Sequence, residues 1–184
     1  MPTTHRWSLL NTLIVTLATS LTVAAPAARD DQILIQGLAA GSQTVKPQGT
    51  DAVRAEYSFN DRGRGDHIVA TWKLDATGIP IEYSGSGNDY MKAPVTETFR
   101  ISGGKATWSN RSEHGEKAVS SAAFYVPNNA PPEFTGVLAR ALLKAKDHRL
   151  AQLPAGEATI APVGSLSPSR IAPTSWLSRT TSFL

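Results

Sequence analysis

The sequence contains no cysteine. This absence excludes disulfide bonds, thiolate zinc sites, cysteine nucleophiles and a lipid anchor attached to a cysteine. Charged residues make up 18% of the 184-residue chain, with 18 Lys and Arg against 15 Asp and Glu. The small positive excess is spread along the chain and forms no basic stripe of the kind that binds phosphate backbones, so we expect no nucleic-acid partner. The length suits a single domain.

Residues 1–27 have the composition of a secretory signal peptide. His5 and Arg6 give a weakly positive start, residues 9–23 are mostly apolar, and small residues follow them. The apolar run is shorter than the roughly 20 residues that span a bilayer, which disfavours the alternative of a retained membrane helix. We therefore expect cleavage after Ala27, a periplasmic or secreted protein, and no membrane association after cleavage.

Much of the remaining chain alternates apolar and polar side chains, as strands do. Residues 53–60 alternate with a period of two, and residues 68–74 resume the pattern after a polar turn at 61–66, so these segments predict a hairpin. Asp75 begins a four-residue turn that ends in Gly78. Further strands are expected at 79–83 and 118–126, with loops at 85–88 and 113–116.

A second hairpin is predicted around residues 103–104, which are both glycine. Two-residue glycine loops favour turns whose twist matches that of the flanking strands. In this register, strands at 95–101 and 105–110 pair, and Phe99 lies opposite Trp108 on the buried side of the ladder.

One amphipathic helix follows the strands. The apolar side chains with helical spacing are Phe134, Val137, Leu138, Ala141, Leu142 and Ala145. Asn129 is expected to cap the helix, and Arg140 and Lys144 to face water. The order of elements predicts an α+β, mainly β fold, in which an antiparallel β-meander sheet carries one amphipathic C-terminal helix. This module is expected to span 28–164, and the tail at 165–184, rich in Ser, Thr and Pro, to be disordered.

Six cationic side chains in the predicted turns are the candidate anion-binding site. The turns of a meander can converge at one end of its sheet, where clustered cations would attract an anion. The six are Arg62, Arg64, His67, Lys92, Arg111 and His114.

No catalytic or metal-ligating residue is assigned. Residues 113–116 hold one imidazole and two carboxylates, but zinc needs three or four converging ligands, and a solvated surface loop is the favoured interpretation. Asp66 and His67 would suit an acid–base pair, but the spacing places no nucleophile beside them.

Four segments, in order along the chain, carry a resemblance to a known family. They are residues 57–67 (YSFNDRGRGDH), 84–95 (SGSGNDYMKAPV), 110–116 (NRSEHGE) and 124–134 (FYVPNNAPPEF). Together they resemble the N-terminal region of secreted bacterial amidohydrolase-family proteins. The resemblance covers about residues 33–166.

The resemblance implies a metal-dependent hydrolase in which this β-rich region precedes a (β/α)8 barrel. In that family a His-x-His pair and further barrel residues hold a divalent metal such as zinc. This sequence has no His-x-His pair, and a barrel needs roughly 250 residues where 18 follow Leu166. We therefore expect no cofactor in this chain and interpret it as a truncated member, produced by a frameshift or an early stop; an ordinary disordered terminus is the alternative.

Two hypotheses of different classes follow. In the first, the chain is a non-catalytic module of a secreted metal-dependent amidohydrolase, with a scaffold or substrate-gating role. In the second, it is a free-standing periplasmic binding module for an anionic or small apolar ligand. A compact hydrolase that uses His67 or His114 is the least supported possibility.

Overall fold

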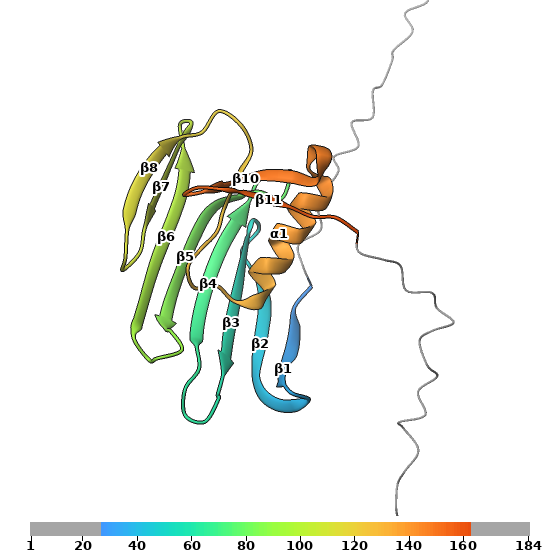
Figure 1. Ribbon diagram of the computed structural model, residues 1–184, viewed down its shortest axis with the longest axis vertical. Coiled ribbons are helices and arrows are strands. Elements are labelled where there is room, and N and C mark those ends of the chain that lie inside the picture. The colour runs from blue at the N-terminus through green and yellow to red at the C-terminus, as the bar shows by residue number, and fades with distance from the viewer. Residues whose placement is uncertain (1–26, 163–184) are drawn as a thin grey trace, which may run out of the picture.

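The computed structural model describes residues 27–162, which form an α+β, mainly β fold (Figure 1). Residues 1–26 of the predicted signal peptide, residues 163–164 of the predicted module and the whole predicted tail lie outside this range. The predicted meander is confirmed as an eight-stranded antiparallel sheet in which neighbours along the chain are neighbours in the sheet. Its strands are β1 (Arg29–Ile35), β2 (Leu38–Gln48), β3 (Ala52–Phe59), β4 (His67–Leu74), β5 (Pro80–Asn88), β6 (Pro94–Ser102), β7 (Lys105–Ser109) and β8 (His114–Ala118).

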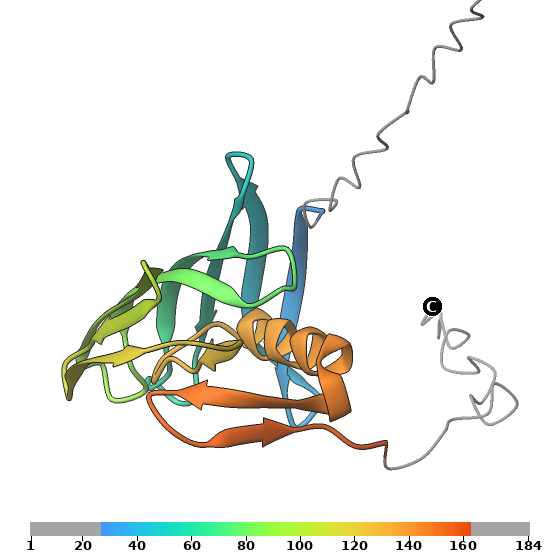
Figure 2. The same cartoon turned by 90° about the horizontal axis from the view of Figure 1, so that it is seen from above.

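A second layer covers one face of this sheet. It consists of α1 (Pro132–Lys144), the short helix η1 (Lys146–His148) and a small sheet of β9 (Ala123–Tyr125), β10 (Arg149–Leu153) and β11 (Glu157–Thr159). In the small sheet β10 pairs with β9 in parallel and with β11 antiparallel. Figure 2 shows the large sheet bending around α1, with the small sheet beside the helix.

The core is a row of aromatic side chains that runs across the strands. Tyr83 pairs with Trp72 on one side and with Phe99 on the other, and Phe99 pairs with Trp108. The register predicted from the glycine pair is therefore confirmed. Phe134 of α1 packs edge-on against Trp72 and Tyr83, with ring centroids 5.3 and 5.0 Å apart. These contacts bury the apolar stripe of the helix against the sheet.

Two predicted loops belong to strands instead, because their glycines make room for aromatic rings. Residues 85–88 lie within β5, where a Cβ on Gly85 would stand 2.9 Å from the Tyr83 hydroxyl. Residues 113–116 contribute to β8, where a Cβ on Gly115 would stand 2.6 Å from the Trp108 ring. Glycine lacks a side chain, so in both strands it marks an aromatic neighbour and not the end of pairing.

The strand expected at 118–126 is wrong in its extent. β8 ends at Ala118, and only Ala123–Tyr125 is again a strand, in the smaller sheet. Four further strands, β1, β2, β10 and β11, had no sequence prediction.

The first anchor of α1 is the carboxylate of Glu97, which is 1% exposed. It accepts hydrogen bonds from the Tyr125 hydroxyl at 2.7 Å and from the backbone N–H groups of Asn128 and Asn129 at 2.9 and 3.2 Å. The Asn129 carbonyl accepts a further bond from the Tyr83 hydroxyl. Asn129 was expected to cap α1, but the capping position is Pro131, with no side-chain hydrogen bond.

The second anchor lies at the first turn of α1. The Gln43 side chain of β2 accepts a hydrogen bond from the Glu133 N–H at 2.9 Å. The buried Glu133 carboxylate pairs with Arg29 of β1 and, at 2.5 Å, with Arg140. Arg140 was expected simply to face water; its side chain is exposed, but its guanidinium neutralises a buried charge.

We expect Glu97→Gln to lower the free energy of unfolding by about 3 kcal/mol, because an amide offers one acceptor oxygen where three donors need two. Tyr125→Phe is the matched control. It leaves both backbone N–H groups paired and should cost about 1 kcal/mol. Urea titration measures both, and a Glu97→Gln midpoint equal to that of the unsubstituted chain would contradict the anchoring role.

The Asp75 turn gives a pH dependence. Oδ1 of Asp75 accepts hydrogen bonds from the Thr77 N–H and hydroxyl and from the Ile79 N–H, at 2.7–3.0 Å. Partial burial opposes ionisation, but these bonds outweigh it, so the pKa of Asp75 falls below its ordinary 3.8. A lowered pKa in the folded state stabilises the fold above about pH 4, and this contribution is lost as the pH falls through the folded pKa.

Asp75→Asn should therefore destabilise the fold at neutral pH by about 1 kcal/mol, as the loss of a side-chain cap does. The difference from the unsubstituted chain should shrink toward about pH 2.5. Urea midpoints at both pH values measure it. A difference independent of pH would show that the carboxylate charge contributes nothing.

Candidate functional site

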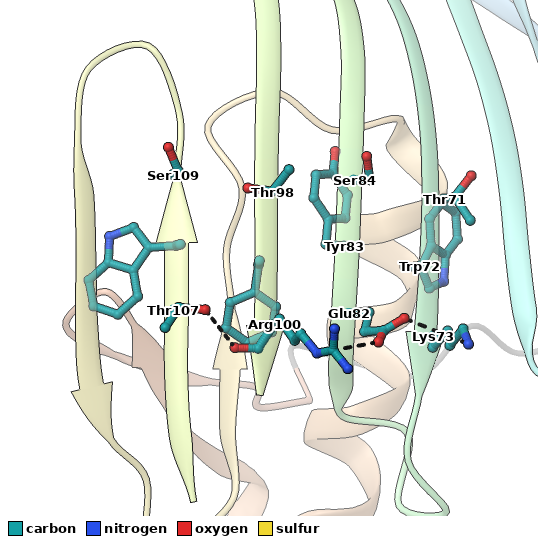
Figure 3. A pocket seen from close by; sticks show the side chains of 12 residues that line it. Thr71, Trp72, Lys73, Glu82, Tyr83, Ser84, Thr98, Arg100, Thr107 and Ser109 are labelled. Carbon is teal, nitrogen blue, oxygen red and sulfur yellow. Dashed lines mark hydrogen bonds and ion pairs between the residues drawn. The ribbon is translucent and has the colours of Figure 1, made fainter. Parts of the chain in front are cut away.

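A shallow trough of about 490 Å³ crosses strands β4 to β7 on the outer face of the large sheet (Figure 3). The helix lies behind the sheet in this view, so the trough opens on the side away from the core. Successive side chains in a strand point to opposite faces. The residues that alternate with the aromatic row therefore line the trough.

One row of the trough consists of hydroxyl groups. Thr71, Ser84, Thr98 and Ser109 occupy directly opposed positions on the four strands. Strand spacing places neighbours in this row about 4.8 Å apart. Thr71 donates a hydrogen bond to the Gln48 side chain at 3.1 Å. The row offers a polar ligand a regular set of donors and acceptors.

The second row carries charge. The Glu82 carboxylate lies 3.7 Å from Lys73 and 3.7 Å from Arg100, and Lys73 also pairs with Asp51 at 3.1 Å. The hydrogen bond to Asp51 is the main reason why the pKa of Lys73 is raised, so this ammonium stays charged. The Arg100 side chain is 67% exposed. Within residues 27–162, its one ion pair is the long contact with Glu82. Of the two cations that line the trough, Arg100 is thus the more accessible to a ligand.

Ser109 and His114 are cross-strand neighbours at the edge of the trough. A serine nucleophile needs a base within hydrogen-bonding distance and a third group that orients the base. In the described part of the chain, no hydrogen bond joins these two side chains. The arrangement suits ligand binding better than nucleophilic catalysis.

The predicted anion site is partly assembled at the end of the sheet where the β3–β4 and β5–β6 connections meet. Lys92 donates a hydrogen bond to the Gly65 carbonyl at 2.9 Å, and the Gly65 N–H donates to the Tyr90 carbonyl at 3.1 Å. Arg64 lies over the Tyr90 ring, 5.7 Å from its centroid. The structure thus brings Arg64 and Lys92 to one turn cluster.

Carboxylates lie among these cations. Asp61 accepts a hydrogen bond from the Tyr90 hydroxyl at 2.9 Å and pairs with Arg62 at 3.1 Å, and both interactions lower the pKa of Asp61. Partial burial and the nearby Asp89 raise the pKa of Asp66. Arg62 itself is 91% exposed. Anion binding at this cluster stays a prediction.

The other predicted residues are spread more widely. Arg111 lines a small polar recess of about 60 Å³ together with Asp89 and Asn128. His67 begins β4 and His114 begins β8, so four strand steps of the sheet separate them. His148 lies in η1, beyond α1. Within residues 27–162, no three His, Asp or Glu side chains gather as metal ligands.

The trough was not among the sequence predictions. Its signal is present in the outward positions of β4 to β7, which are hydroxyl-bearing or charged. The signal becomes readable only when the register of all four strands is known, because the row draws one residue from each.

Comparison with known proteins identified no matching family model, no similar curated protein and no similar solved structure. Among residues 27–162, no helix is both long and apolar enough to cross a membrane.

Phe99 and Arg100 are neighbours on β6 that point to opposite faces of the sheet, so substituting each in turn tests which face contributes more to stability. We expect Phe99→Ala to cost about 3–5 kcal/mol, because the buried ring stacks on Tyr125 with centroids 4.2 Å apart. Arg100→Ala should change the free energy of unfolding by less than about 0.5 kcal/mol, since exposed ion pairs contribute little. Thermal and urea unfolding measure both. A large loss of stability in Arg100→Ala would make the charged row structural and not a binding surface.

Proposed function

We propose that this chain is a non-catalytic, β-rich module of a secreted metal-dependent amidohydrolase, with a scaffold or substrate-gating role. The resemblance of residues 33–166 to the N-terminal region of such proteins motivates the proposal. The observation that carries it is the use of the buried carboxylates. The Glu97 carboxylate accepts hydrogen bonds from Tyr125 of β9 and from the connection to α1, and the Glu133 carboxylate of α1 pairs with Arg29 of β1.

A catalytic acid or base has to exchange a proton with a substrate, which requires access and a vacant hydrogen-bonding position. Glu97 is covered by β9 and by the connection that leads into α1, and it accepts three hydrogen bonds. Glu133 holds Arg29 and Arg140. These groups stabilise a scaffold and are poorly placed for chemistry.

The described residues do not fit the divalent-metal site of that family. Catalytic zinc takes three protein ligands that converge within about 2.2 Å of the ion. His67, His114 and His148 lie on β4, β8 and η1, in separate parts of the fold. We therefore assign no metal to residues 27–162 and propose that the metal-dependent chemistry of such proteins belongs to a barrel. Export to the periplasm or beyond is part of the proposal and rests on residues 1–27.

The trough favours a second candidate, a free-standing periplasmic binding module for a small molecule. Its hydroxyl row and the exposed guanidinium of Arg100 suit an anionic or otherwise polar ligand. They do not suit the small apolar ligand that the sequence left open, because the outward side chains are polar.

Activity and binding measurements separate these functions. The chain from Ala28 onward should show no turnover of dipeptide, cyclic-amide or ester substrates when zinc or manganese is added. Metal-dependent turnover that disappears in His67→Ala or His114→Ala would overturn the proposal. Calorimetric titration with succinate, a dicarboxylate, addresses the second candidate. Binding that is lost in Arg100→Ala and kept in Arg54→Ala, a control on the same face, would favour a binding module over a scaffold.

A further inference from the structure

The last strand of the large sheet, β8, has an open edge. Among residues 27–162, no strand other than β7 pairs with it, and it is the outermost labelled strand on its side of the large sheet in Figure 1. Its side chains are mostly exposed, and it contains no proline. An open edge of this kind is a template for pairing with another strand.

The hydrogen bonds at both ends of β8 show which backbone groups face this edge. The Glu113 carbonyl accepts a bond from the Asn110 N–H, and the Val119 N–H donates to the Gly104 carbonyl, both toward β7 at 2.8 Å. Backbone groups in an antiparallel ladder alternate in direction along the strand. Odd-numbered residues therefore bond to β7, and the N–H and C=O groups of His114, Glu116 and Ala118 point away from the sheet.

We propose that β8 pairs antiparallel with β8 of a second copy of this chain, about a two-fold axis at Gly115. In this register His114 lies opposite the partner's Glu116, and Glu113 lies opposite the partner's Lys117. The two-fold axis repeats the Glu113–Lys117 pair, which gives two contacts of opposite charge, while Glu116 keeps its own ion pair with Lys105 at 2.9 Å. The outward backbone groups of His114 and Glu116 supply the ladder hydrogen bonds.

The glycine suits the axis. Gly115 would face the partner's Gly115 as a pair without ladder hydrogen bonds, the type in which Cα atoms approach to about 4.5 Å. On either side of the axis, Glu113 then meets Lys117, a residue of opposite charge. Two-fold axes at neighbouring residues give a worse match, since an axis at Glu116 or Lys117 places two like charges directly opposite each other.

The other edge strand of the large sheet within the described residues, β1, lacks this complementarity. Arg29 of β1 is already engaged by Asp31 and Glu133. A two-fold axis at Gln32 would place the carboxylates of Asp30 and Asp31 opposite apolar side chains of the partner. Charge complementarity therefore favours β8.

Pairing of one short strand buries less than the roughly 1,200 Å² of a standard stable interface, so the dimer is weak and reversible. Sedimentation velocity between about 10 μM and about 1 mM should show the average mass of the chain from Ala28 rising toward that of a dimer. A chain that stays monomeric over this range would overturn the proposal.

Charge exchange tests the register. Within residues 27–162, neither Glu113 nor Lys117 forms an ion pair, so their substitution should leave the fold intact. Glu113→Lys and Lys117→Glu each set like charges opposite one another across the axis, and each should raise the dimer dissociation constant about tenfold. The double variant restores opposite charges and should restore dimerisation.

Two further variants complete the experiment. Lys146→Glu is the matched control for Lys117→Glu. It makes the same change of charge in η1, away from β8, and this variant should dimerise normally. Glu116→Pro removes an outward N–H without breaking the ladder to β7, and it should be monomeric with a near-normal unfolding temperature. Dimers that persist in the single charge variants, or that fail to return in the double variant, would refute pairing about Gly115.

Discussion

The buried carboxylate of Glu97 is the constraint on which the arrangement of layers depends. A charge removed from water has to be satisfied by donors, and here the donors come from β9 and from the connection to α1. The single side chain therefore fixes β6, the small sheet and the start of the helix relative to one another. The direction of α1 follows, because the same connection is tied to Tyr83 of β5.

The side chains that stabilise the fold and the exposed polar side chains lie on opposite faces of the large sheet. The inner face of the large sheet is filled by the aromatic row and the helix, and its buried Gln43 and Glu97 side chains serve as anchors. The outer face carries hydroxyl groups and exposed ion pairs, a type of pair that contributes little to stability. A module of this design can change its outer surface without disturbing its core, which suits a scaffold as well as a binding surface.

The sequence predicted those features that depend on local patterns. The glycine pair at 103–104 set the register of Phe99 with Trp108, and helical spacing located α1. The same reasoning mistook Gly85 and Gly115 for breaks, because a single strand does not reveal that an aromatic ring fills the space above a glycine. The trough escaped prediction for a related reason, since its rows exist only across several strands. The local pattern could place each of the six predicted cations in or near a turn. It could not reveal which carboxylates lie beside them in the folded chain.

The ion pair between Arg29 and Glu133 has a consequence for how the chain folds. The eight strands pair in sequence order, so each hairpin can form from local contacts as soon as both of its strands are available. Arg29 and Glu133, however, stand 104 residues apart. Closing such a long loop costs more conformational entropy than closing the short loop of a hairpin. The meander can therefore assemble early and in order. The contact between Arg29 of β1 and Glu133 of α1 can form only after the strands and the helix between them in the sequence have been synthesised.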